Sequence, residues 1–442
     1  MSFPKDFTWG TASSSYQIEG AAQEDGRGEC IWTRFSHTPG NVSNNETGDV
    51  ACDHYHLYQH DVALMKAIGL DAYRFSVSWP RVLPTGAGEQ NQAGLDFYSR
   101  LVDALLEAGI TPYVTLYHWD LPQALQQDGE GWENPAIVEK FADYAALMAE
   151  TLGDRVHNWI THNEPWVASF VGNWQGRHAP GKQDLSAAYR AAHHILLSHG
   201  EAVKRLRGML PDHHQIGITL DYADMHAASN GDEDTKIAHL NDGFKNRWFL
   251  DAVFKGTYPA DVVEHVRGVD GALEDIDLDA VQLAAQPIDF LGLNYYTRNV
   301  FEADGSMLGR TVERGDEHTA MDWEVYPDGL YNMLTRVYQD YNPKVLYITE
   351  NGAAFDDPAP ENGTVEDPQR QAYLESHFAA AERALTEGVP LRGYFVWSLM
   401  DNFEWAEGYD KRFGIIYIDY ETHERTLKNS ALYYRDKIAA TR

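Results

Sequence analysis

Two short apolar segments end in polar clusters whose side chains could do acid–base chemistry. Residues 156–160 lead into Thr-His-Asn-Glu-Pro, and residues 345–348 lead into Thr-Glu-Asn-Gly. Each apolar segment predicts a buried strand, so Glu164 and Glu350 are expected at rigid strand ends. They stand 186 positions apart (350 − 164). Two such carboxylic acids suggest the pair that glycosidases use; the alternative is two unrelated strand ends that carry glutamate.

Short apolar runs recur along the chain and predict the strands that must position these residues. The runs are residues 7–10, 71–77, 111–117, 156–160, 215–220, 288–295, 345–349 and 391–398. Amphipathic segments between them predict helices near residues 56–68, 95–108, 185–209, 328–340, 367–387 and 430–439. Three of these helices are followed by a glycine, the residue that commonly ends a helix: Gly69, Gly109 and Gly388.

Eight alternating strand and helix units predict an α/β fold, a single (β/α)8 TIM barrel. No linker composition interrupts the chain, so residues 1–442 are expected to form one catalytic domain. A doubly wound open sheet is the runner-up, but no glycine-rich phosphate loop follows an early strand. In a barrel the active site lies at the carboxyl ends of the strands. The extended loops there are therefore expected to form the active-site pocket.

The composition limits the classes of partner. There are 67 acidic and 35 basic residues, and the formal net charge is −32. Such a surface repels nucleic acid and anionic lipid, so neither is an expected partner. The N-terminus lacks the features of a signal peptide, and no long apolar run predicts a membrane span. A cytoplasmic location is the resulting expectation.

The sequence contains no pattern typical of a metal centre. Cys30 and Cys52 have neither metal-ligand spacing nor a disulfide framework. Three histidine pairs could suggest ligands, but no further ligand accompanies them, so they are assigned to the surface or to helix packing. These pairs are His54/His56, His193/His194 and His213/His214. No metal and no cofactor is expected.

An ordered set of motifs extends over nearly the whole chain. The blocks are residues 7–10, 16–20, 73–81, 115–122, 161–165, 293–296, 348–352 and 397–409. With these blocks the chain closely resembles glycoside hydrolase family 1, the β-glucosidase family, from Phe7 to about Tyr433. The resemblance implies a retaining enzyme that removes terminal β-D-glucosyl residues from β-glucosides and cello-oligosaccharides, and so a link to cellulose degradation. It implies Glu164 as acid/base, Glu350 as nucleophile, and no metal or organic cofactor.

The required protonation states suggest further residues. Glu164 must be neutral to donate a proton, and Glu350 must be ionised to attack the sugar; like charges close together push the two pKa values apart. Arg74, at the end of the second predicted strand, is the cation expected beside Glu350, although it could instead form a structural ion pair. Asn294 and Tyr296 are two positions apart, so both are expected on one face of the sixth strand.

The resemblance also implies two groups of binding residues. Those expected to bind the sugar are Gln17, His118, Asn163, Asn294, Tyr296, Trp397, Glu404 and Trp405. Those expected to border the aglycone are Trp166, His178, Trp323 and Phe413.

Two alternative functions can be tested against the sequence. A 6-phospho-β-glycosidase would need Ser, Lys and Tyr in the eighth loop, where this chain has Glu404-Trp405-Ala406, and a carboxylate repels phosphate. A catalytically silent sugar-binding protein has usually lost a glutamate, and both are present here. The glycone and aglycone preferences and the oligomeric state remain open at this level.

Overall fold

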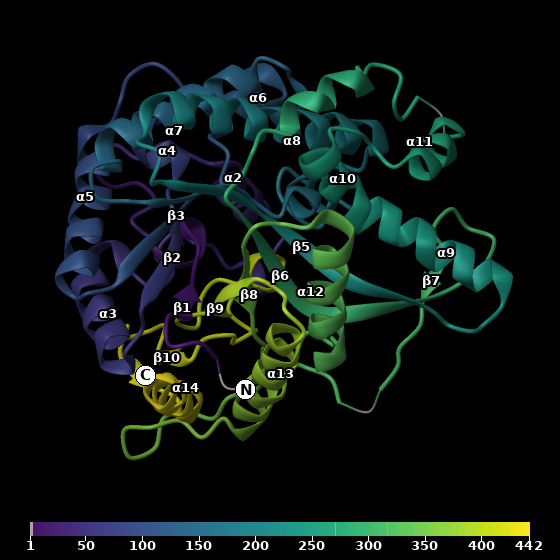
Figure 1. Ribbon diagram of the computed structural model, residues 1–442. Helices are drawn as coiled ribbons and strands as arrows, with labels where there is room; N and C mark the ends of the chain where they lie inside the picture. Colours follow the sequence, from purple (N-terminus) through teal and green to yellow (C-terminus); the bar gives the residue numbers. More distant parts are fainter. Residues whose placement is uncertain (1–2, 270, 316) are drawn as a thin grey trace.

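The computed structural model describes residues 3–269, 271–315 and 317–442, and a closed ring of parallel strands stands at its centre (Figure 1). The strand order is β5-β4-β3-β2-β1-β9-β8-β6, and β5 pairs with β6 to close the ring. The eight strands are β1 (Thr8–Ala12), β2 (Ala72–Ser76), β3 (Thr111–Tyr117), β4 (Asn158–Asn163), β5 (Gln215–Ala227), β6 (Phe290–Glu302), β8 (Leu346–Asn351) and β9 (Leu391–Trp397). The predicted (β/α)8 barrel is therefore confirmed.

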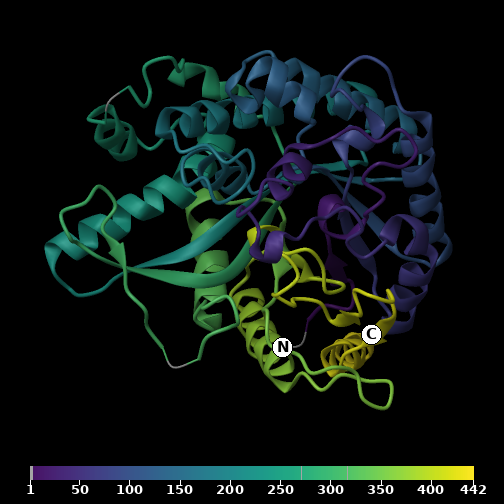
Figure 2. The same ribbon diagram turned by 180° about the vertical axis from the view of Figure 1, so that it is seen from behind.

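Helices surround the ring, as both Figure 1 and the view from behind in Figure 2 show. The α-helices are α1 (Ser15–Ile18), α2 (Ile31–Ser36), α3 (His54–Ile68), α4 (Trp79–Val82), α5 (Gln92–Glu107), α6 (Gln123–Gly129), α7 (Ile137–Leu152), α8 (Leu185–Met209), α9 (Asp232–Asp242), α10 (Trp248–Lys255), α11 (Ala260–Arg267), α12 (Pro327–Tyr341), α13 (Pro368–Thr386) and α14 (Asn429–Thr441). Within the described part of the chain, none of them combines the length and apolar character that crossing a membrane requires.

Shorter helical turns and two minor strand pairings complete the fold. The 3-10 turns are η1 (Ser43–Asn45), η2 (Gly131–Glu133), η5 (Leu278–Ala284) and η6 (Trp405–Glu407), and the π-helical turns are η3 (Val167–Val171) and η4 (Gly243–Arg247). Strand β7 (Arg310–Thr311) pairs antiparallel with β6, and β10 (Ile416–Ile418) pairs antiparallel with β11 (Arg425–Leu427).

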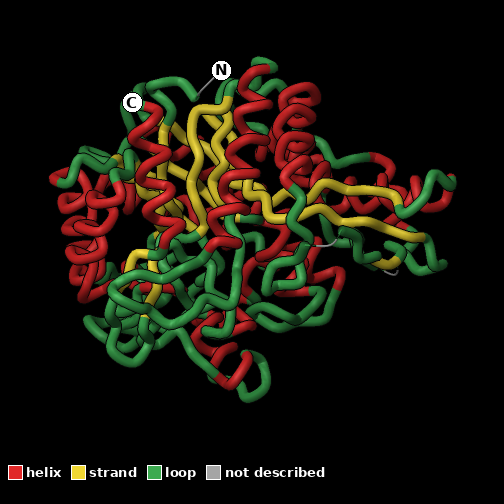
Figure 3. Tube along the Cα trace, turned by 90° about the horizontal axis from the view of Figure 1, so that it is seen from below, coloured by secondary structure: helices red, strands yellow, loops and turns green. Residues whose placement is uncertain are grey.

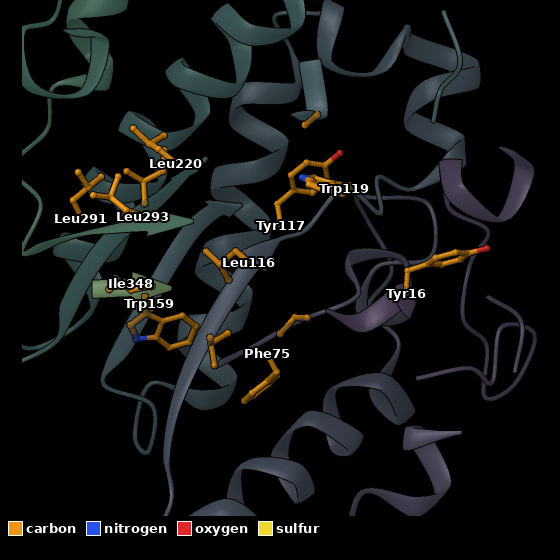
Figure 4. Packing of buried hydrophobic residues seen from close by; sticks show 14 of the residues in the cluster. Tyr16, Phe75, Leu116, Tyr117, Trp119, Trp159, Leu220, Leu291, Leu293 and Ile348 are labelled. Carbon is orange, nitrogen blue, oxygen red and sulfur yellow. The ribbon is translucent and has the colours of Figure 1, made fainter. Parts of the chain in front are cut away.

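The core has two layers. A small cluster that includes Tyr113 and Phe395, with Ala12 and Ala72, draws its buried side chains mainly from strands. A much larger cluster packs the helices onto the strands, and Figure 4 shows part of it, with Leu116, Trp159 and other labelled residues. Amphipathic helices bury one face in this way because their apolar side chains recur with the helical period.

The fourth strand differs from its prediction. The apolar run predicted residues 156–160, whereas β4 spans Asn158–Asn163, so its polar residues lie inside the sheet. These side chains are buried but have partners on α8: Thr161 Oγ1 lies 2.7 Å from His199 Nδ1, and His162 Nε2 lies 2.9 Å from Ser198 Oγ. Hydropathy misplaces the strand end because satisfied polar groups can be buried as well as apolar ones.

The fifth and sixth strands are longer than predicted. The apolar runs ended at residues 220 and 295, but β5 continues to Ala227 and β6 to Glu302. Beyond the barrel the two strands pair with each other and extend outwards beside α9, as Figures 1 and 3 show. Backbone hydrogen bonds between β5 and β6 stabilise this extension, so its side chains need not be apolar.

Long loops gather at one end of the strands, opposite the end where both chain termini lie (Figure 3). The N-terminal segment enters β1 at the amino end of the barrel, so the loop-rich end is the carboxyl end of the strands. The predicted pocket loops therefore lie on the face of the barrel where this fold places its active sites.

Candidate active site

Glu164 directly follows β4 and is held by its backbone. Its N–H donates to Thr219 O on β5 at 3.0 Å, and its carbonyl accepts from Ala168 N at 3.1 Å. Its φ of +49° lies in the left-handed region, which a non-glycine residue seldom adopts. Such strain is tolerated where surrounding structure fixes the conformation, and it is common at functional sites. The side chain is only 5% exposed.

Glu350 lies within β8 and has both oxygens engaged. Arg74 Nη1 donates to Oε1 at 2.5 Å, and the Tyr296 hydroxyl donates to Oε2 at 2.6 Å. Arg74 is 1% exposed and also donates to Asn163 Oδ1 at 2.6 Å and to Thr115 Oγ1 at 3.2 Å. The structure thus places Arg74 and Tyr296 beside Glu350, where the sequence predicted them.

Two asparagines connect the glutamates. Asn294 Nδ2 donates to Glu164 Oε1 at 2.6 Å and lies 3.1 Å from Asn163 Oδ1, the atom that Arg74 also contacts. Thr349 Oγ1 donates to Asn294 Oδ1 at 2.7 Å, so the amide is oriented with its N–H groups towards Glu164. Side chains of β2, β3, β4, β6 and β8 therefore contribute to one buried hydrogen-bond network.

The two carboxyl groups have unequal surroundings. Burial raises the pKa of Glu164 well above its usual range, and the charges of Glu350 and Asp221 add to this rise. Burial also raises the pKa of Glu350, but the Arg74 charge and the Tyr296 hydrogen bond oppose it. Because Glu350 contacts a guanidinium whereas Glu164 contacts an amide, Glu350 loses its proton first.

Both glutamates line a cavity of about 730 Å³ at the carboxyl end of the barrel. Of the residues predicted to bind the sugar, His118, Asn294, Tyr296, Trp397, Glu404 and Trp405 also line it. The His118 ring stacks at 5.9 Å from Trp397 and 6.0 Å from Trp405, which gives this wall a continuous aromatic surface. Burial, with the charges of Glu350 and Glu407, raises the pKa of Glu404 to about 8.

Gln17 and Asn163 lie behind this wall rather than among its lining residues, and both are fully buried. Gln17 Nε2 contacts Glu404 Oε2 at 3.4 Å and donates to Phe403 O at 2.9 Å. Asn163 Nδ2 lies 3.1 Å from His118 Nε2. Gln17 lies on the short helix α1 after β1, not at the strand end itself.

The four residues predicted for the aglycone side all line the same cavity: Trp166, His178, Trp323 and Phe413. Trp323 and Phe413 lie 6.1 Å apart and each faces Tyr296, at 5.3 and 6.1 Å. His178 packs 5.5 Å from Trp119, and burial lowers its pKa to about 3. The outer cavity thus has mainly aromatic walls.

Sequence reasoning missed an ion pair in the cavity. Lys245 contacts the carboxylate of Asp221, and its Nζ lies 3.7 Å from the centre of the Trp166 ring. Both residues line the cavity with Glu164. Asp221 had a usable signal, since it directly follows the fifth apolar run. Lys245 had none, because it reaches the site from the π-helical turn η4.

Comparisons with known proteins agree with this geometry. The model of the family described as "Glycosyl hydrolase family 1" matches residues 1–442. Beta-glucosidase A of Thermotoga maritima is 50% identical over 439 residues, covering 99% of this chain and 97% of that protein. The AHE enzyme from Alicyclobacillus herbarius superposes with a TM-score of 0.96 at 52% identity, covering 100% of this chain and 98% of the other.

The chain is also similar to a solved structure that contains a bound ligand. Beta-glucosidase from Thermotoga maritima in complex with glucoimidazole superposes with a TM-score of 0.96 at 49% identity, covering 100% of this chain and 99% of that chain. With a match over its full length, two carboxylates in one barrel cavity and relatives at about half identity, the chain belongs to glycosyl hydrolase family 1.

Proposed function

We propose that this protein is a retaining β-glucosidase that hydrolyses terminal β-D-glucosyl residues of small β-glucosides, cello-oligosaccharides among them. One observation carries the proposal: two buried carboxyl groups share a cavity, and Glu350 alone of the two contacts the Arg74 guanidinium. The beta-glucosidase of Thermotoga maritima, half identical in sequence, and its complex with glucoimidazole support it.

In the first half of the proposed cycle, Glu164 gives its proton to the glycosidic oxygen as the bond from that oxygen to the anomeric carbon breaks. Glu350 Oε attacks the same carbon from the opposite face and forms an ester. Arg74 and Tyr296 keep Glu350 ionised until it reacts. The aglycone leaves as an alcohol.

In the second half, water takes the place of the aglycone. Once Glu350 is a neutral ester, its repulsion of Glu164 is gone, so the pKa of Glu164 falls and its carboxylate can accept a proton from water. The hydroxide equivalent attacks the anomeric carbon and the ester bond breaks. Glu350 returns as a carboxylate and Glu164 as an acid, with glucose in the β configuration.

We also propose that residues 1–442 act as one catalytic domain. The closed sheet draws on strands from β1 to β9, and α14 packs back on the first strand, where the Tyr434 hydroxyl donates to Gly10 O at 2.8 Å. A bond between the two ends of the chain supports a single cooperative unit.

Kinetics on para-nitrophenyl glycosides test the activity. β-Glucoside should be cleaved, with some turnover of β-galactoside or β-fucoside. The 6-phospho-β-glucoside should be a poor substrate because the eighth loop has Glu404-Trp405-Ala406 where a phosphate site would need Ser, Lys and Tyr. Cleavage of the 6-phospho substrate alone would favour the 6-phospho-β-glycosidase alternative. No turnover of any glycoside would favour the silent sugar-binding protein.

Trapping the ester tests the mechanism. A 2-deoxy-2-fluoro-β-glucoside with a good leaving group slows both steps, because fluorine destabilises the oxocarbenium-like transition state, and the second step slows more. The expected result is one equivalent of sugar attached to Glu350, found by mass spectrometry of peptides. Attachment to a different carboxylate would contradict the assignment of the nucleophile.

A further inference from the structure

Three histidines meet at the amino end of the barrel, away from the catalytic cavity. His157 immediately precedes β4, and His213 and His214 lie in the turn between α8 and β5. None of the three lines the cavity that holds Glu164 and Glu350. The pair His213/His214 lacked a third ligand in the sequence, and His157 supplies it from 56 positions earlier (213 − 157).

The strand register explains why they meet. Asn158 of β4 is paired with Gln215 of β5, and Gln215 N donates to His157 O at 2.7 Å. His157 and His214 each directly precede one of these paired residues, so the parallel ladder sets them side by side. His213 is the next residue back in the turn.

The three rings form a compact group. The ring centres lie 5.0 Å apart for His157–His213, 4.9 Å for His157–His214 and 4.5 Å for His213–His214. One nitrogen from each ring lies within 4.8 Å of the other two. His157 and His213 are exposed, and none of the hydrogen bonds among the described residues involves either imidazole. Their lone pairs are therefore free.

His214 is buried and oriented by the backbone. Its Nε2 lies 2.9 Å from Gly153 O, at the end of α7, and its Nδ1 lies 3.1 Å from Pro211 O. A neutral imidazole has one N–H and can satisfy only one of these carbonyls. Pro211 O already accepts from the His214 backbone N–H at 3.0 Å, so it is the more easily released. A ring N–H donated to a backbone carbonyl is typical of a metal-bound histidine.

We propose that His157, His213 and His214 form a binding site for one divalent transition-metal ion, Zn²⁺ being the best fit. Three imidazole nitrogens suit Zn²⁺, Cu²⁺ or Ni²⁺ and not Mg²⁺ or Ca²⁺, which prefer oxygen. A tetrahedral zinc ion would take water as its fourth ligand.

The geometry requires a small closure. Nitrogens about 2.05 Å from a tetrahedral zinc ion lie roughly 3.4 Å from one another, so the rings must approach by about an ångström or more. Rotation of the two exposed side chains, His157 and His213, provides this movement without moving the sheet. His214 remains fixed by its carbonyl contact.

The charges around the group are compatible with a cation. Arg207 donates to His214 O at 3.0 Å, but its charge is paired with Asp289. The net charge of −32 attracts cations to the whole surface.

Metal binding here would connect the start of β4 with the turn that enters β5. These segments separate when the barrel unfolds, so an ion that binds the folded protein raises its unfolding temperature. The site lies outside the catalytic cavity, so the turnover number should stay the same with or without the ion.

Zinc titration of the chelator-treated, desalted protein tests the proposal. Calorimetry at pH 7.5 should show one equivalent of Zn²⁺ bound by the wild type, and Co²⁺ should give visible absorption bands as a spectroscopic substitute. His157→Ala and His213→Ala should each weaken zinc binding by about tenfold or more, since loss of even an outer-shell partner has this effect. His265→Ala, which removes an exposed histidine of α11, is the matched control and should bind like the wild type.

Thermal unfolding and turnover provide independent readouts. Zinc should raise the unfolding temperature of the wild type and of His265→Ala but not of the two test variants, while para-nitrophenyl β-glucoside turnover at 25 °C stays unchanged. Because both test positions are exposed, the alanine variants should fold. Zinc affinity unchanged in either test variant would overturn the three-histidine site, and so would an equal loss in His265→Ala.

Discussion

The proposed catalytic pair, Glu164 and Glu350, illustrates how identical side chains acquire different chemistry from their neighbours. Glu350 accepts hydrogen bonds from Arg74 and Tyr296, whereas Glu164 accepts one from the Asn294 amide. Because both glutamates are buried, one guanidinium contact decides which carboxyl group ionises first. The proposed roles therefore follow from contacts only a few ångströms long, and single substitutions can separate them.

Substitution of each glutamate should yield azide products of opposite configuration. Glu350→Gly removes the nucleophile and should lower hydrolysis by about 10⁴-fold or more; azide entering the vacated space attacks once and yields an α-glucosyl azide. Glu164→Ala keeps the nucleophile, so an activated substrate still forms the ester, and azide, which needs no base, releases it as a β-glucosyl azide. Proton NMR distinguishes the anomers. The same anomer from both variants, or exchanged anomers, would show that the roles are reversed.

The Asp221–Lys245 pair should adjust the alkaline limb of the pH profile. The charge of Asp221 raises the pKa of Glu164 and that of Lys245 lowers it. Asp221→Asn should therefore move the alkaline limb of kcat/KM to lower pH, and Lys245→Met should move it to higher pH, because this limb reports loss of the proton from the free enzyme's acid.

The substrate for this experiment should have a poor leaving group, such as cellobiose, so that protonation by Glu164 limits the first step. Lys204→Met is the matched control, because Lys204 is an exposed lysine of α8 whose partner is Glu201. Shifts in the same direction for the two test variants would refute the electrostatic explanation.

At the scale of elements, the strand ends present side chains to the cavity and also bring neighbouring backbones into close contact. Gly352 follows β8 directly after Glu350 and Asn351, and a Cβ at this position would lie 1.6 Å from Trp397 O at the end of β9. Two neighbouring strands thus come together beside Glu350, the proposed nucleophile, and Trp397, part of the aromatic wall of the cavity. A side chain here would push the two apart.

Gly352→Ala should damage both stability and activity. The clash is with backbone, which cannot rotate away, so a loss of about 1–3 kcal/mol or more in unfolding free energy is expected. Gly208→Ala is the control: Gly208 is exposed on α8 and its added Cβ meets nothing within 4 Å, so a gain of about 0.5–1 kcal/mol is expected. Denaturant unfolding with parallel kinetics measures both. A Gly352→Ala protein as stable and active as the wild type would show that β8 and β9 separate easily.

At the scale of the whole molecule, the dominant feature is charge. The formal net charge is −32. The excess carboxylates repel one another across the folded surface, and this repulsion lowers the stability of the compact state. Several buried groups are compensated internally, as Lys428 is by Asp357 and Asp401, so the uncompensated charge lies mainly outside the core.

The unfolding temperature should therefore rise with ionic strength. Screening shortens the reach of surface charges from about 30 Å at 0.01 M salt to about 3 Å at 1 M, so most of the gain should come before 0.5 M. Differential scanning calorimetry in sodium chloride, repeated in potassium chloride, separates screening from effects of one particular cation. A temperature that stays constant or falls over this range would mean that self-repulsion contributes little to stability.

Much of the architecture could be predicted from the sequence because it depends on local periodicity. Helix α8 has the predicted bounds, residues 185–209, since its helical pattern is long and Asp184 caps it by accepting from Ala187 N at 3.0 Å. Gly69 ends α3 with a φ of +82°, a conformation that its lack of a Cβ permits. The glutamates were found for the same reason, because each stands in a polar cluster that follows an apolar strand pattern.

Other features of the site could be found only in the tertiary structure. They depend on which strands become neighbours and on the register in which those strands pair. Lys245 reaches Trp166 and Asp221, and His157 meets His213 and His214, through the closure of the barrel and not through spacing along the chain. The end of β4 could not be predicted from the sequence either. The hydrogen-bond partners of its buried polar side chains lie on a helix some 40 residues away, as for Thr161 and His199 (199 − 161 = 38). Hydropathy measures whether a side chain prefers to be buried. It carries no information about which distant group will form a hydrogen bond with a polar side chain that is buried.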